Sequence, residues 1–172
     1  KFVQKNNLRL DFFSWHRYSP NLNKFTKDKE SVERVIHEFP QTAANLEWYI
    51  TEFGPDSEVN PAYDGNSAAA HLIAATKISL GQINRLYTFE VVDGKNPENK
   101  KYWGRWGLIT HPDFGISLKP RAQAFQLLNK LQGLWINSTG DGDWVKAIAA
   151  KTPAGTIQVL IANYDHYGRH SE

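Results

Sequence analysis

The sequence predicts an α/β fold in which three strand–helix units are followed by a short antiparallel β-segment. Apolar runs alternate with stretches of helical apolar spacing up to Gly133, and this alternation is typical of a parallel sheet built from βαβ units. Beyond Gly133 only short strands and turn residues follow, which indicates a second module. We therefore expect residues 1–133 to form the α/β module and residues 134–172 to form the start of a β-sandwich.

The elements of the α/β module are predicted from hydrophobic spacing and from the residues that end each helix. Largely apolar runs indicate buried parallel strands, and apolar residues three or four positions apart indicate amphipathic helices. Pro40, Gly81 and Gly133 end the three helices. The expected strands are residues 8–15, 45–51 and 83–92, and the expected helices are residues 27–39, 67–80 and 119–132.

Two loops of the α/β module carry residues of interest. Residues 16–20 follow the first strand, and residues 93–118 form a long loop without a predicted helix. Loops of that length in a compact domain are usually functional or disordered.

The second module is predicted to contain three short strands. The expected strands are residues 134–137, 144–150 and 156–163, with a hairpin turn over residues 151–155. Three such strands are too few to close a β-sandwich alone.

Composition excludes several classes of protein. The net charge of +2 is spread over both signs, so no basic stripe indicates a nucleic-acid partner. No apolar run approaches the length of a membrane span, and no signal peptide is present, so we expect no membrane partner. The compartment stays open, since a secreted and a lysosome-like location both fit. The chain starts at Lys1 and contains no methionine, which leads us to expect a processed or truncated chain.

The sequence contains no motif that indicates a metal or cofactor site. Cysteine is absent, which excludes disulfides and thiolate metal sites, and no acidic cluster reproduces a metal-binding loop. We therefore expect no metal and no cofactor. The six Trp and seven Tyr exceed what a small core needs, and aromatic faces in loops suit stacking on sugar rings, so a carbohydrate is the expected ligand.

The aromatic and histidine residues outside the candidate site are given structural roles. We expect Trp15, Trp48, Trp135 and Trp144 to lie in the core. The histidines without a carboxylate at matching spacing are expected to be ordinary surface or helix residues: His37, His71 and His111.

Glu52 ends the second predicted strand and is followed by a break at Gly54. Catalytic residues of (β/α)8 barrels come from the C-terminal ends of strands, although a complete barrel needs roughly 250 residues. Strand alternation places Trp48, Ile50 and Glu52 on one side of the strand. A carboxylate aimed into a barrel mouth is costly to desolvate unless it has partners or a function. The alternative is a rim glutamate held by a neighbouring Arg or Lys.

Four motifs in order resemble the last third of a family-39 glycoside hydrolase barrel, a family that includes β-xylosidases and α-L-iduronidases. They are Asp-Phe-Phe-Ser-Trp-His-Arg-Tyr-Ser at 11–19, Ile-Thr-Glu-Phe-Gly at 50–54, Trp-Gly-Leu-Ile-Thr at 106–110 and Lys-Pro-Arg-Ala-Gln-Ala-Phe at 119–125. The resemblance covers about residues 5–133, and the tail resembles the β-sandwich that follows such barrels. It implies that the three βα units are the last three, units six to eight, of a (β/α)8 barrel.

The resemblance also implies roles for individual residues. Glu52 matches the nucleophile of a retaining mechanism at the end of the seventh strand, and His16 and Tyr18 match residues that contact the sugar. Phe89 and Glu90 match in position the residues of the eighth strand that close the subsite. The plainer alternatives are a His16 bonded to a backbone carbonyl and a Tyr18 packed on its loop.

Trp103 and Trp106 lie in the long loop and are expected to bind substrate as stacking platforms on the aglycone side. The alternative is that they cover the barrel rim.

The sequence departs from the family pattern in two places. Phe53-Gly54 stands where relatives often carry Tyr-Asn or Trp-Asn, and the chain has no Asn-Glu pair, the motif that carries the family's acid/base. We therefore expect this chain to supply the nucleophile while a missing N-terminal barrel portion or a partner chain, joined through a large apolar interface, supplies the acid/base. The chain alone would then be inactive. The alternatives are a non-catalytic carbohydrate-binding or scaffold protein and a structural fragment made by proteolysis.

Overall fold

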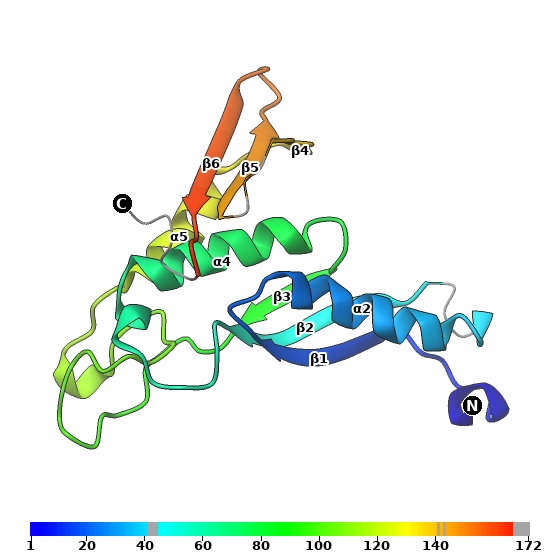
Figure 1. The fold of residues 1–172 in the computed structure, drawn as a ribbon, viewed down its shortest axis with the longest axis horizontal. Helices are drawn as coiled ribbons and strands as arrows, with labels where there is room; N and C mark the ends of the chain where they lie inside the picture. Colours follow the sequence, from blue (N-terminus) through cyan, green and yellow to red (C-terminus); the bar gives the residue numbers. More distant parts are fainter. Residues whose placement is uncertain (41–44, 141, 143, 167–172) are drawn as a thin grey trace.

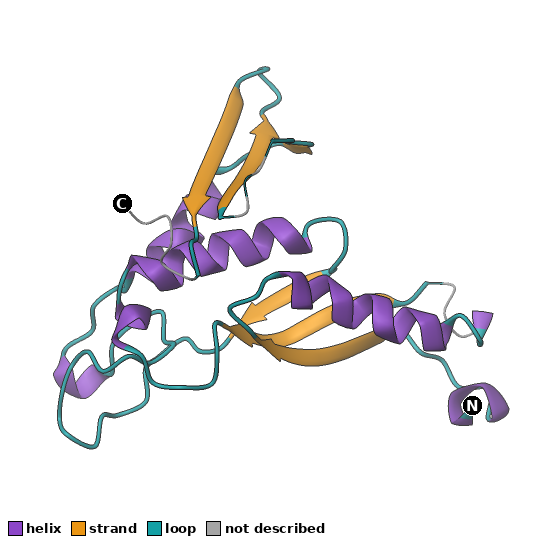
Figure 2. Cartoon of the chain, in the orientation of Figure 1, coloured by secondary structure: helices purple, strands orange, loops and turns teal. Residues whose placement is uncertain are grey.

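The computed structural model describes residues 1–40, 45–140, 142 and 144–166, and these form two three-stranded sheets with helices between and beside them (Figure 1, Figure 2). The expected alternation of strands and helices, followed by an antiparallel segment, is confirmed. The elements in chain order are α1 (Phe2–Lys5), β1 (Phe12–Tyr18), α2 (Asn23–Ile36), β2 (Glu47–Gly54), η1 (Pro61–Asp64), α4 (Asn66–Ser79), β3 (Arg85–Thr88), η2 (Pro112–Phe114), α5 (Pro120–Lys130), β4 (Leu134–Ile136), β5 (Val145–Lys151) and β6 (Ile157–Asn163).

The first sheet is parallel, in the order β1-β2-β3, and α2 and α4 lie on the same face of it (Figure 1). The β1 residues Trp15 and Arg17 face α2, where both contact Asp28. The opposite face leaves Phe12 and Tyr87 half-exposed. The two faces of this sheet therefore differ in how completely they are covered.

The strand boundaries differ from the sequence-based expectation at the carboxyl end of the sheet. Residues 16–18, expected in a loop, complete β1, because they continue the ladder with β2. The second strand also continues past the expected end, so Glu52 lies inside β2. The third strand is shorter than the expected residues 83–92 and ends at Thr88, beyond which the carbonyls of Phe53 and Phe89 accept bonds from the buried Arg121.

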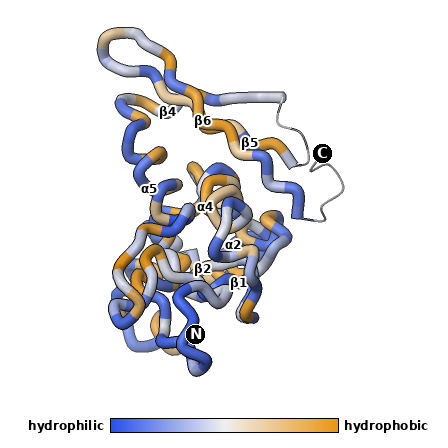
Figure 3. Tube along the Cα trace, turned by 90° about the vertical axis from the view of Figure 1, so that its left-hand side faces the viewer, coloured by the Kyte–Doolittle hydropathy of each residue, from blue (hydrophilic) through white to orange (hydrophobic). Residues whose placement is uncertain are grey.

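Helix α4 is the centre of the core and contacts both sheets. One side of it packs against Ile50 and Phe53 of β2, and the other meets Ile148 of β5 and Ala162 of β6. Small buried residues such as Ala74 let the neighbouring elements approach α4 closely. Apolar colouring along α4 and β6 in Figure 3 follows this arrangement. A single apolar cluster therefore spans the expected boundary between the two modules.

The antiparallel sheet, in the order β4-β5-β6, has one covered and one uncovered face. Ile148 and Leu160 point toward α4, whereas Ile157, Val159 and Ile161 are more than half exposed. An exposed apolar face of this kind usually meets a partner surface. The assignment of residues 134–172 to a β-sandwich stays a prediction, and residues 141, 143 and 167–172 lie outside the described part of the chain.

The expected core positions of the tryptophans are partly wrong, and one helical histidine is buried. Trp48 is buried, but Trp135 is 52% exposed, because β4 lies at the edge of its sheet. His71, expected as an ordinary surface or helix residue, is fully buried on the α4 face that meets both modules. A single histidine at helical spacing carries no signal that separates these two situations.

The His71 ring joins three parts of the chain. Its Nε2 lies 3.1 Å from the backbone oxygen of Ser19, so the Nε2–H tautomer donates a hydrogen bond there. The Tyr164 ring packs edge-on against His71 with 5.2 Å between ring centroids, and the Tyr164 hydroxyl donates to the backbone oxygen of Pro20 at 3.2 Å. Burial lowers the pKa of His71 to about 3, so the ring is neutral at pH 7.

We predict that the buried His71 makes the fold sensitive to acid. Its pKa in the folded state lies below the unfolded value of about 6.5, so its stabilising contribution is complete above about pH 6.5 and is lost as the pH falls toward 3. The free energy of unfolding should therefore fall by up to about 1.4 kcal/mol per pH unit through this group. Urea unfolding of the wild type and of His71→Phe, over about pH 4.5–7, measures the difference in slope.

The matched control is His37→Phe at the end of α2, where the ring is exposed and the pH slope should equal that of the wild type. An unchanged slope in His71→Phe would contradict the prediction.

Candidate active site

The residues expected to form the site come together at the carboxyl end of the parallel sheet. His16 and Tyr18 lie on β1, Glu52 lies on the adjacent β2, and Phe89 and Glu90 directly follow β3. Parallel strands present their carboxyl ends at the same edge, where α/β proteins bind ligands.

A β-bulge at Thr51 decides which way Glu52 points. On one side β2 pairs Ile50 with Trp15 and Glu52 with His16, which leaves Thr51 without a partner residue. On the other side Ile50 pairs with Leu86 and Phe53 with Thr88, so β2 again has one residue more than its neighbour. The Thr51 hydroxyl donates to the backbone oxygen of Trp15 at 3.2 Å. The register therefore shifts by one residue in the pairing of β2 with each of its two neighbours.

The expectation that Trp48, Ile50 and Glu52 share one side of the strand is wrong for Glu52, because the bulge turns this residue to the other side. Ile50 and Phe53 both belong to the core under the helices, although they are three residues apart. Glu52, between them, consequently faces the opposite side of the sheet, together with His16 and Tyr18. Bulges next to active sites commonly re-aim a side chain in this way.

Two side chains of β1 contact the same oxygen of Glu52. The Tyr18 hydroxyl donates to Oε2 at 2.9 Å, and Nδ1 of His16 lies 3.3 Å from that oxygen. Burial and the hydrogen bond to Glu52 both raise the pKa of Tyr18, so the phenol stays protonated and donates at neutral pH. The Glu52 side chain is 33% exposed, so the carboxylate can be reached from outside. Among the described residues its partners are a phenol and an imidazole, not the Arg or Lys of a rim ion pair.

Glu90 lies in a more enclosed setting. Its Oε1 is 3.7 Å from Nη2 of Arg105, and both side chains are about three-quarters buried. Burial raises the pKa of Glu90, with the positive charge of Arg105 acting against the increase. This carboxyl group is therefore more readily protonated than an exposed one.

The two loop tryptophans have different surroundings. Trp106 is only 6% exposed, and the Arg105 guanidinium lies 3.9 Å from the ring centroid. The rings of Tyr18 and Phe89 lie 6.4 Å and 6.0 Å from Trp106. Trp103 donates through Nε1 to the backbone oxygen of Gly94 at 3.1 Å. Stacking of sugars on these rings stays a prediction, and the burial of Trp106 favours a packing role at the rim.

The long loop after β3 is held by the buried Lys119, which was not among the residues expected to matter from the sequence. Lys119 Nζ lies 2.8 Å and 3.0 Å from the two carboxylate oxygens of Asp93 and 2.6 Å from Oδ1 of Asp64. It also donates to the backbone oxygen of Arg105 at 2.7 Å. The side chains of Lys119 and Asp93 are completely buried. Asp64 and Asp93 therefore anchor the loop through Lys119.

Arg121 is the second buried cation at the start of α5. It donates through Nη1 to the backbone oxygens of Phe89 at 2.8 Å and Trp106 at 2.6 Å, and through Nη2 to that of Phe53 at 2.9 Å. One sequence signal could have indicated these roles. Two cations at the amino end of a helix oppose its dipole, so Lys119 and Arg121 need partners elsewhere.

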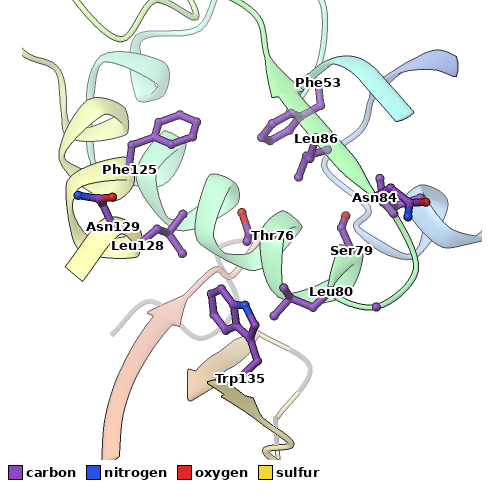
Figure 4. Close-up of a pocket in the computed structure, with 12 residues that line it drawn as sticks. Phe53, Thr76, Ser79, Leu80, Asn84, Leu86, Phe125, Leu128, Asn129 and Trp135 are labelled. Atoms are coloured by element: carbon purple, nitrogen blue, oxygen red, sulfur yellow. The ribbon is translucent and has the colours of Figure 1, made fainter. Parts of the chain in front are cut away.

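A pocket of about 400 Å³ opens on the helix-covered side of β3, between α4, α5 and β4 (Figure 4). Its lining holds no titratable side chain, so it is separate from the carboxylates described above. The residues that line it include Leu80, Leu86, Phe125, Leu128, Asn129 and Trp135.

Within the described residues, no three His, Asp or Glu side chains gather as a metal site would require. No helix in this part of the chain has the length and apolarity that are needed to cross a bilayer.

The family described as glycosyl hydrolases family 39 matches residues 1–165. A glucosidase from Croceicoccus marinus superposes with a TM-score of 0.71 at 23% identity, over 95% of this chain and 35% of its own. A GH39 β-xylosidase from Caulobacter crescentus superposes with a TM-score of 0.66 at 22% identity, over 88% of this chain and 32% of its own. A GH39 enzyme from Xanthomonas axonopodis pv. citri superposes with a TM-score of 0.62 at 20% identity, over 88% of this chain and 32% of its own. The chain thus spans about a third of the length of these proteins, and no curated protein matches it.

We predict that Lys119→Met destabilises the fold strongly. The substitution leaves the carboxylate of Asp93 buried without its cation, and removing one partner of a buried pair costs about 3–5 kcal/mol. Urea unfolding measures the difference. Lys100→Met, which breaks the exposed pair with Glu98, is the control and should change stability by less than about 0.5 kcal/mol. If both substitutions lowered the free energy of unfolding by the same amount, the buried cluster would stabilise the fold no more than the exposed ion pair does.

Proposed function

Because this chain belongs to the family-39 glycosyl hydrolases, we propose that it forms part of a retaining glycoside hydrolase with Glu52 as its nucleophile. The family match confirms the resemblance predicted from the sequence. The observation that carries the finer proposal is the re-aimed Glu52, whose carboxylate contacts both Tyr18 and His16 at the carboxyl edge of the sheet.

The contacts of Glu52 suit a nucleophile. In a retaining mechanism one ionised carboxylate attacks the anomeric carbon while a carboxylic acid about 5–5.5 Å away protonates the leaving oxygen. Tyr18 donates to the ionised form of Glu52, and a hydrogen bond of this kind stabilises the charge and fixes the plane of the carboxylate. We propose that the acid/base comes from a segment or chain other than residues 1–172.

The neighbouring residues suit the binding of one sugar ring. His16 and Tyr18 can exchange hydrogen bonds with sugar hydroxyls, and the Glu90–Arg105 pair offers both an acceptor and donors. Phe89 adds an apolar surface beside them. We propose a carbohydrate as the substrate, with Trp103 on the aglycone side of the site.

The uncovered face of the parallel sheet supports a further barrel portion as the partner. Phe12 stacks on Tyr49 with 4.8 Å between ring centroids, and Phe12 and Tyr87 are half-exposed on the face that would form the barrel interior. The solved relatives are about three times as long as this chain. We propose that residues 1–133 are the last three βα units of a (β/α)8 barrel that the partner completes.

We predict that native mass spectrometry of the isolated protein detects a second polypeptide bound to this chain or a covalent N-terminal extension of it. Completing a barrel buries a large apolar surface, so the partner should stay bound through purification. An Asn-Glu strand end in the added sequence would be the expected source of the acid/base. A 172-residue monomer without any addition would remove catalysis by this protein from the proposal.

We predict that Glu52 is labelled by dinitrophenyl 2-deoxy-2-fluoroglycosides, with the xyloside and the glucoside as probes. The fluorine slows hydrolysis of the glycosyl-enzyme, and the good leaving group removes the need for a general acid, so the label tests the nucleophile alone. Intact mass and peptide mapping should show one adduct on Glu52. Turnover by the complete enzyme should fall by several orders of magnitude in Glu52→Ala.

Glu47→Gln, at the far end of the same strand, is the matched control and should label normally. An adduct that persists in Glu52→Gln would exclude Glu52 as the nucleophile. Sugar binding that survives Glu52→Gln, in a protein whose wild type shows neither labelling nor turnover, would favour the alternative of a non-catalytic carbohydrate-binding protein.

A further inference from the structure

We propose that Arg121 is a positioning residue for the candidate active site. Its guanidinium fixes the backbone that carries Glu52 and Glu90, and so sets how the two carboxylates lie relative to each other. The inference rests on the proposed function, because only a reacting site needs that orientation to be held closely.

The geometry places one side chain under three segments of the site. Nη2 of Arg121 bonds the carbonyl of Phe53, the residue after Glu52. Nη1 bonds the carbonyl of Phe89, the residue before Glu90, and also that of Trp106. The three distances lie between 2.6 and 2.9 Å, and Arg121 is 1% exposed. A planar guanidinium is suited to such divergent acceptors, because its five donors are fixed in one plane.

Arg121 acts where the ordinary strand ladder is weak. The direct bond between the end of β2 and the segment after β3, from Phe89 N–H to the Phe53 oxygen, is 3.4 Å long. The bond from Glu90 N–H to the Trp106 oxygen is also 3.4 Å. The bulge at Thr51 disturbs the register just before this point. The guanidinium therefore supplies shorter bonds to the same carbonyls and holds the strand ends together.

The charge of Arg121 also matters for the site. Burial lowers the pKa of Arg121 to about 10, so it remains protonated at neutral pH. Its three acceptors are neutral carbonyls, and no ion pair with a described carboxylate cancels its field. That field acts against the rise in the pKa of Tyr18, the hydroxyl that bonds Glu52. Arg121 therefore contacts the site's backbone and influences one of its side chains.

The test compares Arg121→Lys with the wild type, using the isolated protein with any chain that accompanies it. Lysine keeps the charge but has a single ammonium group, which cannot bond three carbonyls in different directions. Amide hydrogen exchange at Phe89, Glu90 and Leu108 should accelerate at least about tenfold, while exchange in β5 stays within about twofold. The rate constant for labelling of Glu52 should fall about 10–100-fold, with the half-saturating probe concentration changed less than about threefold.

Arg121→Gln, which removes the charge but keeps a planar donor group, is a second variant. Arg34→Lys on the exposed side of α2 is the matched control, and it should change neither exchange nor labelling. If Arg121→Lys labels at the wild-type rate, or if exchange accelerates equally in β5, Arg121 serves stability only and the proposal is overturned.

The two proposals fail in different ways. A wild type that takes no label would refute the role of Glu52, while accelerated exchange confined to the three site amides would still support the anchoring by Arg121. Unchanged exchange at those amides would overturn the anchoring whether or not Glu52 is labelled.

Discussion

The arrangement of the site depends on the single extra residue that β2 carries at Thr51. Without the bulge, strand alternation would place Glu52 on the same side as Ile50, under the helices, where an ionised carboxylate is costly to bury. With it, Ile50 and Phe53 both fill the core while Glu52 reaches the opposite face. One strand thus contributes to the packing against α4 and to the candidate site within four residues.

This local irregularity requires compensation, which the first turn of α5 provides. The strand ends after the bulge are held by Arg121, and the loop that follows β3 is held by Lys119 through Asp93 and Asp64. Two cations at a helix amino terminus are unfavourable in isolation. Here each is neutralised or solvated by groups of the loops, so the helix start becomes the anchor of the carboxyl edge of the sheet.

The order of the elements could be predicted from local periodicity, whereas the grouping of His16, Tyr18 and Glu52 was expected from the resemblance to family 39. The bulge could not be predicted from the sequence, because it is defined only by the registers in which β2 pairs with β1 and β3. The extension of β1 through Tyr18 likewise comes from pairing with β2, not from local propensity. The burial of His71 and of Arg121 depends on contacts between segments more than fifty residues apart, which leave no periodic trace.

The second module also bears on the geometry of the site, through the loop that follows Tyr18. Ser19 donates its N–H to the backbone oxygen of Gly54 at 2.9 Å, which ties the end of β1 to the end of β2. The oxygen of Ser19 is bonded by His71 of α4, and the next carbonyl, that of Pro20, is bonded by Tyr164 beyond β6. The backbone next to Tyr18 and Glu52 is therefore braced by a helix and by the antiparallel module together. Because α4 packs against both sheets, a shift of the antiparallel sheet against the helices would strain these bonds first, so the two modules form one mechanical unit around the candidate site.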